Sequence, residues 1–517
     1  MSRYIPATVA ALVWLLIAAR LAQISTTAGA VTIAVFLLFC IRLLLAWGSS
    51  PADGEPPECE VSVVLPLYNE DPELLRRCLE SLARQTYLPQ RVWLVDDGSD
   101  DPSAADAAEA FEAPFELQVI RCEENRGKRR AQAEAFSRDA TAEVFVTADS
   151  DTIFHTDAIR EGLKPFTNLA VTAVAGLVRP INRSRNLLTR LQDSEYLSSF
   201  LLERASLSKL QGSVLVTSGG LALYRADVVR EVLAEYVAQT FAGRPVHTGD
   251  DRMLTQLSLQ RGRVVMQHTA IADTAVPERW SHLLRQRVRW SRSFWVNSLW
   301  VFGNMPTRSW AFWLVGYYLA SVTALFLSLL IVAIVAPELG LRFVGVFLLM
   351  VAGLSYLRAA RMLAVQLPGS TPWGQLSTYL MVGPAVVFNL LVLMPVRLWA
   401  LIKIRDVANW GTRQQVETSP TVRRRRQRLR KVGSPPHGSS GSPEMGGLMA
   451  RMVPVPRPSA RVSYPPQCGG ASLPVERPTG HSSGARTRAT CAGKPKPRWT
   501  ARSTGTPSPP TGSAASS

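Results

Sequence analysis

The chain lacks the cysteine spacing that marks a metal site or a disulfide framework. It has six cysteines among 517 residues, and none of them forms a C-x-x-C pair. Reduced thiols on the cytosolic side are therefore expected. The six are Cys40, Cys59, Cys78, Cys122, Cys468 and Cys491.

Most of the chain also lacks an excess of basic over acidic residues, although the formal net charge of the whole is +17. From Arg413 onward there are 18 Lys and Arg and three Glu, a net charge of +15, which leaves +2 for everything before. No nucleic-acid partner is therefore expected for the folded body. The run RRRRQRLRK at 423–431 suits either anionic membrane lipid or a solvated flank without a specific partner.

Apolar residues, in contrast, are abundant and clustered. A helix needs about 20 of them to cross a hydrocarbon core, and five runs near the two ends of the chain indicate an integral membrane protein. The first run is not expected to be a cleaved signal peptide, because a second follows without a clear cleavage site. The runs are 8–19, 28–47, 310–336, 343–356 and 376–402.

The charges between these runs predict a multi-pass protein of the plasma membrane. Arg3 precedes the first run and the next loop, QISTTAG, is uncharged, so the N-terminus and the large domain should be cytoplasmic. The basic stretches 357–362 and 405–413 should be cytoplasmic as well, so the chain between them must enter and leave the membrane on the same side. The segment 376–402 is then expected to be a re-entrant or bent hairpin, broken by Pro384 and Pro395.

Between the apolar runs, strand-like and helix-like segments alternate. EVSVVLPLY, RVWLVDDGS and EVFVTADSD are typical of strands, and DPELLRRCLESLARQ is typical of a helix. Such alternation predicts an α/β domain with a mostly parallel sheet, whose ligands bind beyond the carboxyl ends of the strands.

This pattern divides the chain into six expected parts. The last is expected to be disordered, because it is rich in Gly, Pro, Ser and Arg without apolar periodicity. The parts are two N-terminal membrane helices (1–54), a cytosolic catalytic domain (55–280), amphipathic interfacial helices (281–308), membrane and re-entrant helices (309–404), a loop with a basic flank (405–432) and the tail (433–517).

Acidic residues follow three successive predicted strands. Glu70 follows the first, Asp97 the second, and Asp149 and Asp151 the third. A single strand-end Asp is often a helix cap, but three such clusters indicate one site. Two carboxylates one residue apart suit Mg²⁺ or Mn²⁺, which often bridges protein carboxylate to phosphate.

Two further charged motifs lie on either side of Asp149 and Asp151 in the sequence. Lys128 and Arg129 stand near the start of a predicted helix and suit a diphosphate, although a solvated helix face gives the same pattern. In TGDDR, Asp250 or Asp251 could serve as a general base.

The segment LLRQRVRWSRSFW, 283–295, offers a third chemical surface. On a helix, Gln286, Arg289 and Trp290 stand at i, i+3 and i+4 and share one face. This face presents an amide, a cation for phosphate charge and an aromatic plate for a sugar. A basic, Trp-rich helix lying at a membrane surface has a similar composition.

Taken together, these motifs resemble the membrane-embedded processive glycosyltransferases of family 2. The resemblance is strongest to class I hyaluronan synthases, covers about residues 58–415, and is shared in large part by chitin-oligosaccharide synthases. The motifs are VVLPLYNED, VDDGS, NRGKRRAQAEAF, TADSD, RNLLTRLQDSEY, VTSGGLALYR, TGDDRMLT, RQRVRWSRSF and NWGTR.

The resemblance implies a GT-A type α/β domain fused to transmembrane helices, with UDP-GlcNAc and UDP-GlcA as substrates and a growing polysaccharide as product. It implies a UDP site, a metal pair, an acceptor pocket, a base and a gating loop. The UDP site would comprise Tyr68, Glu70, Asp97, Lys128, Asp149 and Ser150, and the metal pair would be Asp149 and Asp151. The acceptor pocket would comprise Ser218, Gly219, Gly220 and Trp290, and the base would be Asp251 beside Asp250. Gln286, Arg289 and Trp290 would clamp the acceptor and the diphosphate, and Trp410 to Arg413 would form the gating loop near the nucleotide.

One departure from the family pattern bears on the acceptor. Many members have Cys before the Ser-Gly and Pro after it, where this chain has Thr217 and Gly220. Two alternatives remain at this point. One is a chitin-type or other β-glycan synthase that uses a single UDP-sugar, and the other is a transporter or adaptor whose α/β domain only binds nucleotide.

Overall fold

The computed structural model describes residue 37 and residues 40–320 and 337–405. This part of the chain contains one eight-stranded sheet, in the order β3-β2-β1-β4-β7-β6-β10-β5, and a small ribbon of β8 and β9. The strands are β1 (Val61–Leu67), β2 (Arg91–Asp96), β3 (Glu116–Arg121), β4 (Val144–Thr147), β5 (Ile153–Phe154), β6 (Val171–Pro180), β7 (Ala222–Arg225), β8 (Thr240–Phe241), β9 (Arg244–Pro245) and β10 (Arg263–Thr274).

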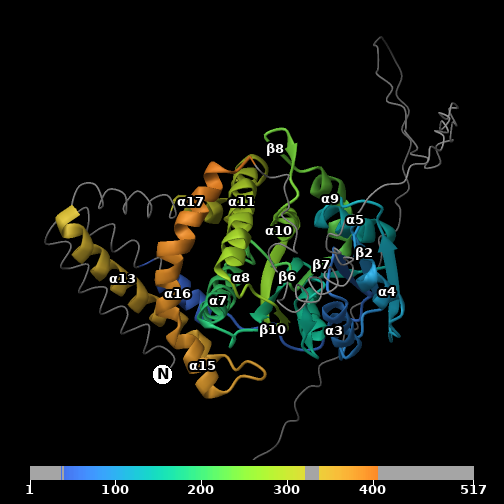
Figure 1. The fold of residues 1–517 in the computed structure, drawn as a ribbon, viewed down its shortest axis with the longest axis horizontal. Coiled ribbons are helices and arrows are strands. Elements are labelled where there is room, and N and C mark those ends of the chain that lie inside the picture. Colours follow the sequence, from blue (N-terminus) through green and yellow to red (C-terminus); the bar gives the residue numbers. More distant parts are fainter. Residues whose placement is uncertain (1–36, 38–39, 321–336, 406–517) are drawn as a thin grey trace, which may run out of the picture. The chain divides into compact units, whose positions relative to one another are not determined.

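Helices precede and follow most strands (Figure 1). The α-helices are α3 (Pro72–Ala83), α4 (Ser103–Glu109), α5 (Lys128–Arg138), α6 (Ala158–Leu163), α7 (Leu187–Ser198), α8 (Ala205–Lys209), α9 (Ala226–Ala238), α10 (Asp250–Arg261), α11 (Trp280–Asn304), α13 (Pro337–Ala359), α14 (Arg361–Ala364), α15 (Pro372–Leu380), α16 (Val382–Phe388) and α17 (Met394–Ile402). Three short segments have other helical geometries: η2 (Lys164–Thr167) is a 3₁₀-helix, and η3 (Ser199–Arg204) and η4 (Asn389–Leu393) are π-helical.

Several predictions concern residues outside the described part. These are the apolar run 8–19, most of the run 28–47, the end of the run 310–336, the loop residues Trp410 and Arg413, and the tail 433–517.

The strand–helix alternation predicted the sheet correctly. β1 pairs in parallel with β2 and with β4, and β2 pairs in parallel with β3. β7 runs antiparallel between β4 and β6, and β5 runs antiparallel on β10, so the sheet is mostly parallel. All seven residues of β1 are buried, as expected for a central strand covered on both faces.

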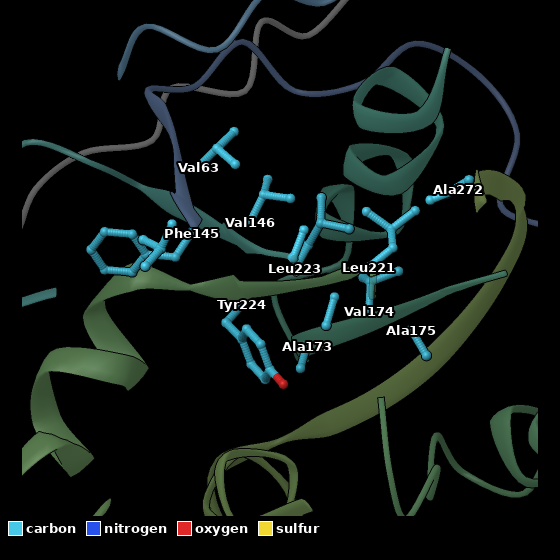
Figure 2. Packing of buried hydrophobic residues seen from close by; sticks show 14 of the residues in the cluster. Val63, Phe145, Val146, Ala173, Val174, Ala175, Leu221, Leu223, Tyr224 and Ala272 are labelled. Atoms are coloured by element: carbon cyan, nitrogen blue, oxygen red, sulfur yellow. The ribbon is translucent and has the colours of Figure 1, made fainter. Parts of the chain in front are cut away.

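The core forms where the central strands lie side by side. Figure 2 shows Val63 of β1, Val146 of β4, Val174 of β6 and Leu223 of β7 gathered in one cluster. α5 packs against β1, β2 and α9, and α6 packs against β10. Burial of this kind stabilises by about 25 cal/mol per Å² of apolar surface, and it fixes the loops at the carboxyl ends of the strands.

The segment expected to contain interfacial helices is a single helix, α11. The side chains of Gln286, Ser293 and Asn297 on α11 are buried, and Gln239 Nε2 donates to Asn297 Oδ1 at 3.1 Å. On another side, Trp295 Nε1 donates to the Arg397 carbonyl of α17 at 2.8 Å. α11 therefore connects the α/β domain with the apolar helices that follow it.

The hairpin expected at 376–402 is wrong. α15, α16, the π-helical turn η4 and α17 follow one another as one helical run, Pro372–Ile402, drawn in orange in Figure 1. Pro384 cannot donate to the Leu380 carbonyl, and the Tyr356 hydroxyl donates to that carbonyl instead, at 2.7 Å. The proline therefore interrupts the helical hydrogen bonds without reversing the chain.

This run is also the candidate membrane span. Among the described residues it is the one helix long and apolar enough to cross a membrane, and Trp310–Ala320 is a shorter apolar helix. The other expected spans, and the orientation of the chain, stay predictions.

Candidate active site

A cavity of about 250 Å³ opens at the carboxyl ends of β1, β2, β4 and β10. This is the edge of the sheet where the acidic clusters were predicted to meet, and the structure brings them together there. The predicted site residues that line the cavity are Tyr68, Asp97, Lys128, Asp149, Asp151, Ser218, Gly219, Gly220, Asp250, Asp251, Gln286, Arg289 and Trp290.

Asp97, at the end of β2, orders the loop before α5. Its carboxylate accepts the backbone N–H groups of Arg126 at 2.8 Å and of Gly127 at 2.7 Å. Burial raises the pKa of Asp97, and these two hydrogen bonds oppose the rise. Asp97 thus fixes the backbone from which the next residue, Lys128, enters the cavity.

Lys128 links two of the predicted motifs. Its Nζ lies 2.7 Å from Asp149 Oδ1 and 3.1 Å from Asp250 Oδ2. Burial alone would lower the pKa of Lys128, but the charges of Asp149 and Asp250 outweigh it and raise the pKa above its usual value. The ammonium therefore stays charged at the centre of the acidic residues.

Arg129, predicted to bind a diphosphate together with Lys128, does not line the cavity. It is 3% exposed, and its guanidinium donates to the carbonyl of Thr248 at 3.0 Å and to Gln239 Oε1 at 2.8 Å. On helix α5 the neighbouring side chains of Lys128 and Arg129 point in different directions. Arg129 therefore holds the segment that leads into Asp250.

Asp149 and Asp151 follow β4 and flank Ser150. The Ser150 hydroxyl donates to Glu70 Oε2 at 2.8 Å, so these two residues lie beside the cavity and tie the end of β1 to the end of β4. Thr274 Oγ1, at the end of β10, lies 3.4 Å from Asp151 Oδ1. Hard carboxylate oxygens next to a phosphate-sized space suit Mg²⁺ or Mn²⁺.

Asp250 and Asp251 form the first turn of α10. The turn before them requires Gly249, which has φ +72° and whose added Cβ would lie 2.0 Å from Ser293 Oγ. Asp251 accepts the backbone N–H of Arg252 at 2.7 Å. Burial, and then the charge of Asp250, raise the pKa of Asp251, which suits a group that must accept a proton.

The turn Ser218 to Gly220 forms another wall. Ser218 has φ +89°, a conformation that costs energy in a residue with a side chain. A Cβ on Gly219 would lie 3.1 Å from Lys128 Nζ, so the missing side chain lets the turn approach the lysine. Thr217 is fully buried behind this wall, where its hydroxyl meets those of Tyr224 at 2.6 Å and Thr255 at 3.0 Å.

The predicted face of α11 lines the cavity with Gln286, Arg289 and Trp290. The centre of the Trp290 ring lies 6.4 Å from that of the Tyr196 ring, and the Arg287 guanidinium lies 4.6 Å from the centre of the Trp290 ring. Arg287 also makes two hydrogen bonds to Glu195, at 2.9 and 2.7 Å. These contacts hold an aromatic plate at the edge of the cavity.

The sequence did not assign several residues that line the cavity. Glu195 and Tyr196 lie in the motif LQDSEY, and Arg287 lies between two predicted residues of α11. Arg204 gives no sequence signal, because the packing of η3 brings it to the cavity.

Comparison with known proteins identifies the class. A family model described as Glycosyl transferase family 2 matches residues 62–233. The hyaluronan synthase of Streptococcus pyogenes is 35% identical over 404 residues, which cover 76% of this chain and 92% of that protein. An N-acetylglucosaminyltransferase of Azorhizobium caulinodans is 31% identical over 369 residues, covering 70% and 89% respectively.

The chain belongs to the family 2 glycosyltransferases, and its sheet has the GT-A-like arrangement of that family. The family predicted from the motifs is thus confirmed, and membership favours an enzyme over a nucleotide-binding adaptor. Among solved structures, a mannosyltransferase from Pyrobaculum calidifontis in complex with GDP-Man and Mn²⁺ aligns with a TM-score of 0.44 and 20% identity, covering 74% of this chain and 99% of that one.

Proposed function

We propose that this protein is a membrane-embedded, processive, inverting glycosyltransferase that joins UDP-GlcNAc and UDP-GlcA into hyaluronan and exports the chain. One observation carries the activity: Asp149 and Asp151, the pair Asp250 and Asp251, and Arg289 of α11 line a single cavity. The choice of polymer rests on the 35% identity to the streptococcal hyaluronan synthase.

A divalent cation fits the carboxylates of Asp149 and Asp151. Mg²⁺ is commonly held by one or two protein carboxylates together with substrate phosphates. In the described ranges, no group of three or more His, Cys, Asp or Glu is placed to hold a metal ion, so the proposed ion rests on this carboxylate pair together with the diphosphate. When bound, the ion would neutralise charge on the departing UDP.

The protein's own groups divide the remaining work. Lys128 is charged and lies between the two acidic motifs, where it would hold diphosphate oxygens. Arg289 would add a second cation, and Trp290 a stacking surface for the acceptor sugar. Asp251 would take the proton of the acceptor hydroxyl, which then displaces UDP from C1 in one step and inverts an α-linked sugar to a β-linkage.

The structure favours Asp251 over Asp250 as the base. Asp250 is paired with Lys128 at 3.1 Å. Within the described residues, no cation lies in salt-bridge distance of the Asp251 carboxylate, which accepts the N–H of Arg252. Asp251 is therefore the carboxylate more available to a hydroxyl group.

A second candidate function is the synthesis of a chitin-type polymer from UDP-GlcNAc alone. It is supported by the relative described as an N-acetylglucosaminyltransferase, at 31% identity. UDP release from membranes that contain the full chain, with each UDP-sugar singly and with both together, distinguishes the two.

Hyaluronan synthesis predicts long polymer only when both UDP-sugars are present, digestion of that polymer by hyaluronidase, and loss of UDP release in EDTA. Polymer from UDP-GlcNAc alone that resists hyaluronidase would establish the chitin-type function instead. Full activity in EDTA would contradict the metal role of Asp149 and Asp151.

A further inference from the structure

Two arginines share one aromatic ring beside the active-site cavity. The guanidinium of Arg252, on α10, lies 5.6 Å from the centre of the Phe294 ring, and that of Arg397, on α17, lies 5.4 Å from the same centre. Arg252 lines the cavity. Phe294 belongs to α11, so three helices converge on this point.

The backbone around the pair is well fixed. The Arg397 carbonyl accepts the indole N–H of Trp295 at 2.8 Å, and the Arg252 N–H donates to Asp251 Oδ1 at 2.7 Å. Both guanidinium groups therefore lie beside the Phe294 ring, and the backbones that carry them are held by contacts of their own.

The negative charge of Asp251 partly offsets the positive charge of Arg252, but among the described residues no salt bridge joins either arginine of the pair to an acidic side chain. In the described part of the chain, no carboxylate lies within 4.0 Å of either guanidinium, whereas Arg287 nearby is paired with Glu195 at 2.7 Å. Burial lowers the pKa of Arg252, which means that the charged form is less well stabilised than in water. Two partly buried cations beside the same ring carry a cost in free energy, because their charges are poorly solvated. A bound anion would remove this cost.

A further arginine extends the positive charge along the cavity wall. Arg204 lies 4.0 Å from the Phe200 ring centre, and it donates to the Val216 carbonyl at 2.8 Å and to Ser199 Oγ at 3.1 Å. Burial lowers the pKa of Arg204 to about 10. The cavity lining therefore contains Arg204 and Arg252 in addition to the acidic residues around Lys128.

We propose that Arg252 and Arg397 form a carboxylate-binding subsite for a uronate unit of the growing polysaccharide. This inference rests on the proposed function and narrows it. A planar guanidinium binds a planar carboxylate with two parallel hydrogen bonds, and a neutral chitin-type chain has no group that uses this charge.

The diphosphate of UDP and the glucuronate of UDP-GlcA are the other anions that enter the cavity. The diphosphate already has Lys128, and Arg289 on α11, as cations on the predicted nucleotide side. Arg252 lies instead immediately after Asp251, the proposed base, which must face the acceptor. The arginine pair is thus assigned to the acceptor chain rather than to the nucleotide.

The test compares two labelled tetrasaccharides binding to the purified full chain in lipid nanodiscs. One alternates glucuronate with N-acetylglucosamine, and the other is the same molecule with its carboxyl groups reduced to alcohols. The wild type should bind the uronate form about tenfold more tightly or better, the usual effect of one charged hydrogen-bonded pair. Arg252→Gln and Arg397→Gln should each bring the two affinities close together.

Three controls make the result specific. Arg285→Gln changes an exposed arginine of α11 outside the cavity and should keep the preference. Arg252→Lys keeps a charge at the subsite and should retain part of it. The affinity for UDP, which carries no uronate, should be unchanged in both Gln variants.

A wild-type preference that persists in both Gln variants would overturn the subsite, even if both UDP-sugars are needed for polymer. A weakened affinity for UDP with an unchanged preference would assign the pair to the diphosphate, which also overturns the subsite. Polymer from UDP-GlcNAc alone, with equal binding of the two tetrasaccharides, would instead remove the proposed function itself.

Discussion

Asp250 and Asp251 carry the same side chain but have different surroundings. Asp250 pairs with Lys128, whereas Asp251 accepts a backbone N–H and has its pKa raised by burial and by Asp250. Neighbours one residue apart on a helix point about 100° apart, which is enough to give the two carboxylates different partners.

We predict that Asp251→Asn lowers the turnover number on the order of 10²–10⁴-fold, the usual contribution of a general base. Asn keeps the shape of Asp but cannot accept a proton. The affinity for the nucleotide, measured by the binding of labelled UDP, should change little. Normal turnover in Asp251→Asn together with a large loss in Asp250→Asn would reverse the assignment.

The pH dependence of activity should report the same carboxylate. A base works only when it is ionised, so activity falls as the pH drops through its pKa. Because burial and the charge of Asp250 raise the pKa of Asp251, the acid limb of kcat/KM should lie above that of an ordinary Asp, which is about 3.9. Asp250→Asn should move this limb to lower pH, and an unmoved limb would contradict the coupling.

Gly219 tests the approach of the turn to Lys128. A methyl group there would lie 3.1 Å from Lys128 Nζ and 3.7 Å from Asp149 Oδ2, so Gly219→Ala should displace the lysine. We expect the KM for UDP-sugar to rise about tenfold, the worth of one charged hydrogen bond. Gly303→Ala, where the added methyl meets nothing within 4 Å, is the matched control and should leave KM unchanged.

At the scale of elements, the segment before β7 is tied to α10 by buried hydroxyl groups. The Thr255 hydroxyl donates to the Asp251 carbonyl at 2.6 Å, and Thr217 links it to Tyr224. Thr217 is buried behind the cavity wall, which gives it a part in packing rather than in contact with the acceptor.

Thr217→Val should therefore destabilise the fold more than it changes the chemistry. The substitution keeps the shape but leaves the buried Tyr224 hydroxyl without its 2.6 Å partner, at a cost of about 1–3 kcal/mol. Thermal unfolding should show the loss, while the KM for UDP-sugar should stay near the wild-type value. Thr217→Ser should restore the stability, and unchanged melting in both variants would refute this role.

The sequence predicted elements well where local pattern decides them. β1, β2 and β4 are continuous apolar runs, and their parallel pairing brought Asp97, Asp149 and Asp151 to one edge. The path of 376–402 was mispredicted because the effect of Pro384 depends on the Tyr356 hydroxyl of another helix. The common position of Arg252 and Arg397 beside Phe294 was not predicted for the same reason, because the packing of three helices creates it.

At the scale of the whole molecule, deletion of residues 433–517 should leave catalysis intact. The segment has no apolar periodicity that could contribute to a core. UDP release per correctly inserted molecule is the measurement, and about a tenfold loss, the usual effect of one charged hydrogen bond, would overturn the prediction. Truncation before Trp410 should abolish activity, because it removes the proposed gating loop.

The strand order also governs how the chain can be made. β7 lies between β4 and β6, and β10, which ends at Thr274, pairs along β6 from Arg263 onward. During synthesis the ribosome releases β1 and β2 long before their sheet can be completed, so early intermediates expose unpaired edges. A fragment limited to residues 62–233, the part that the family model matches, lacks β10 and should aggregate rather than fold as an independent domain.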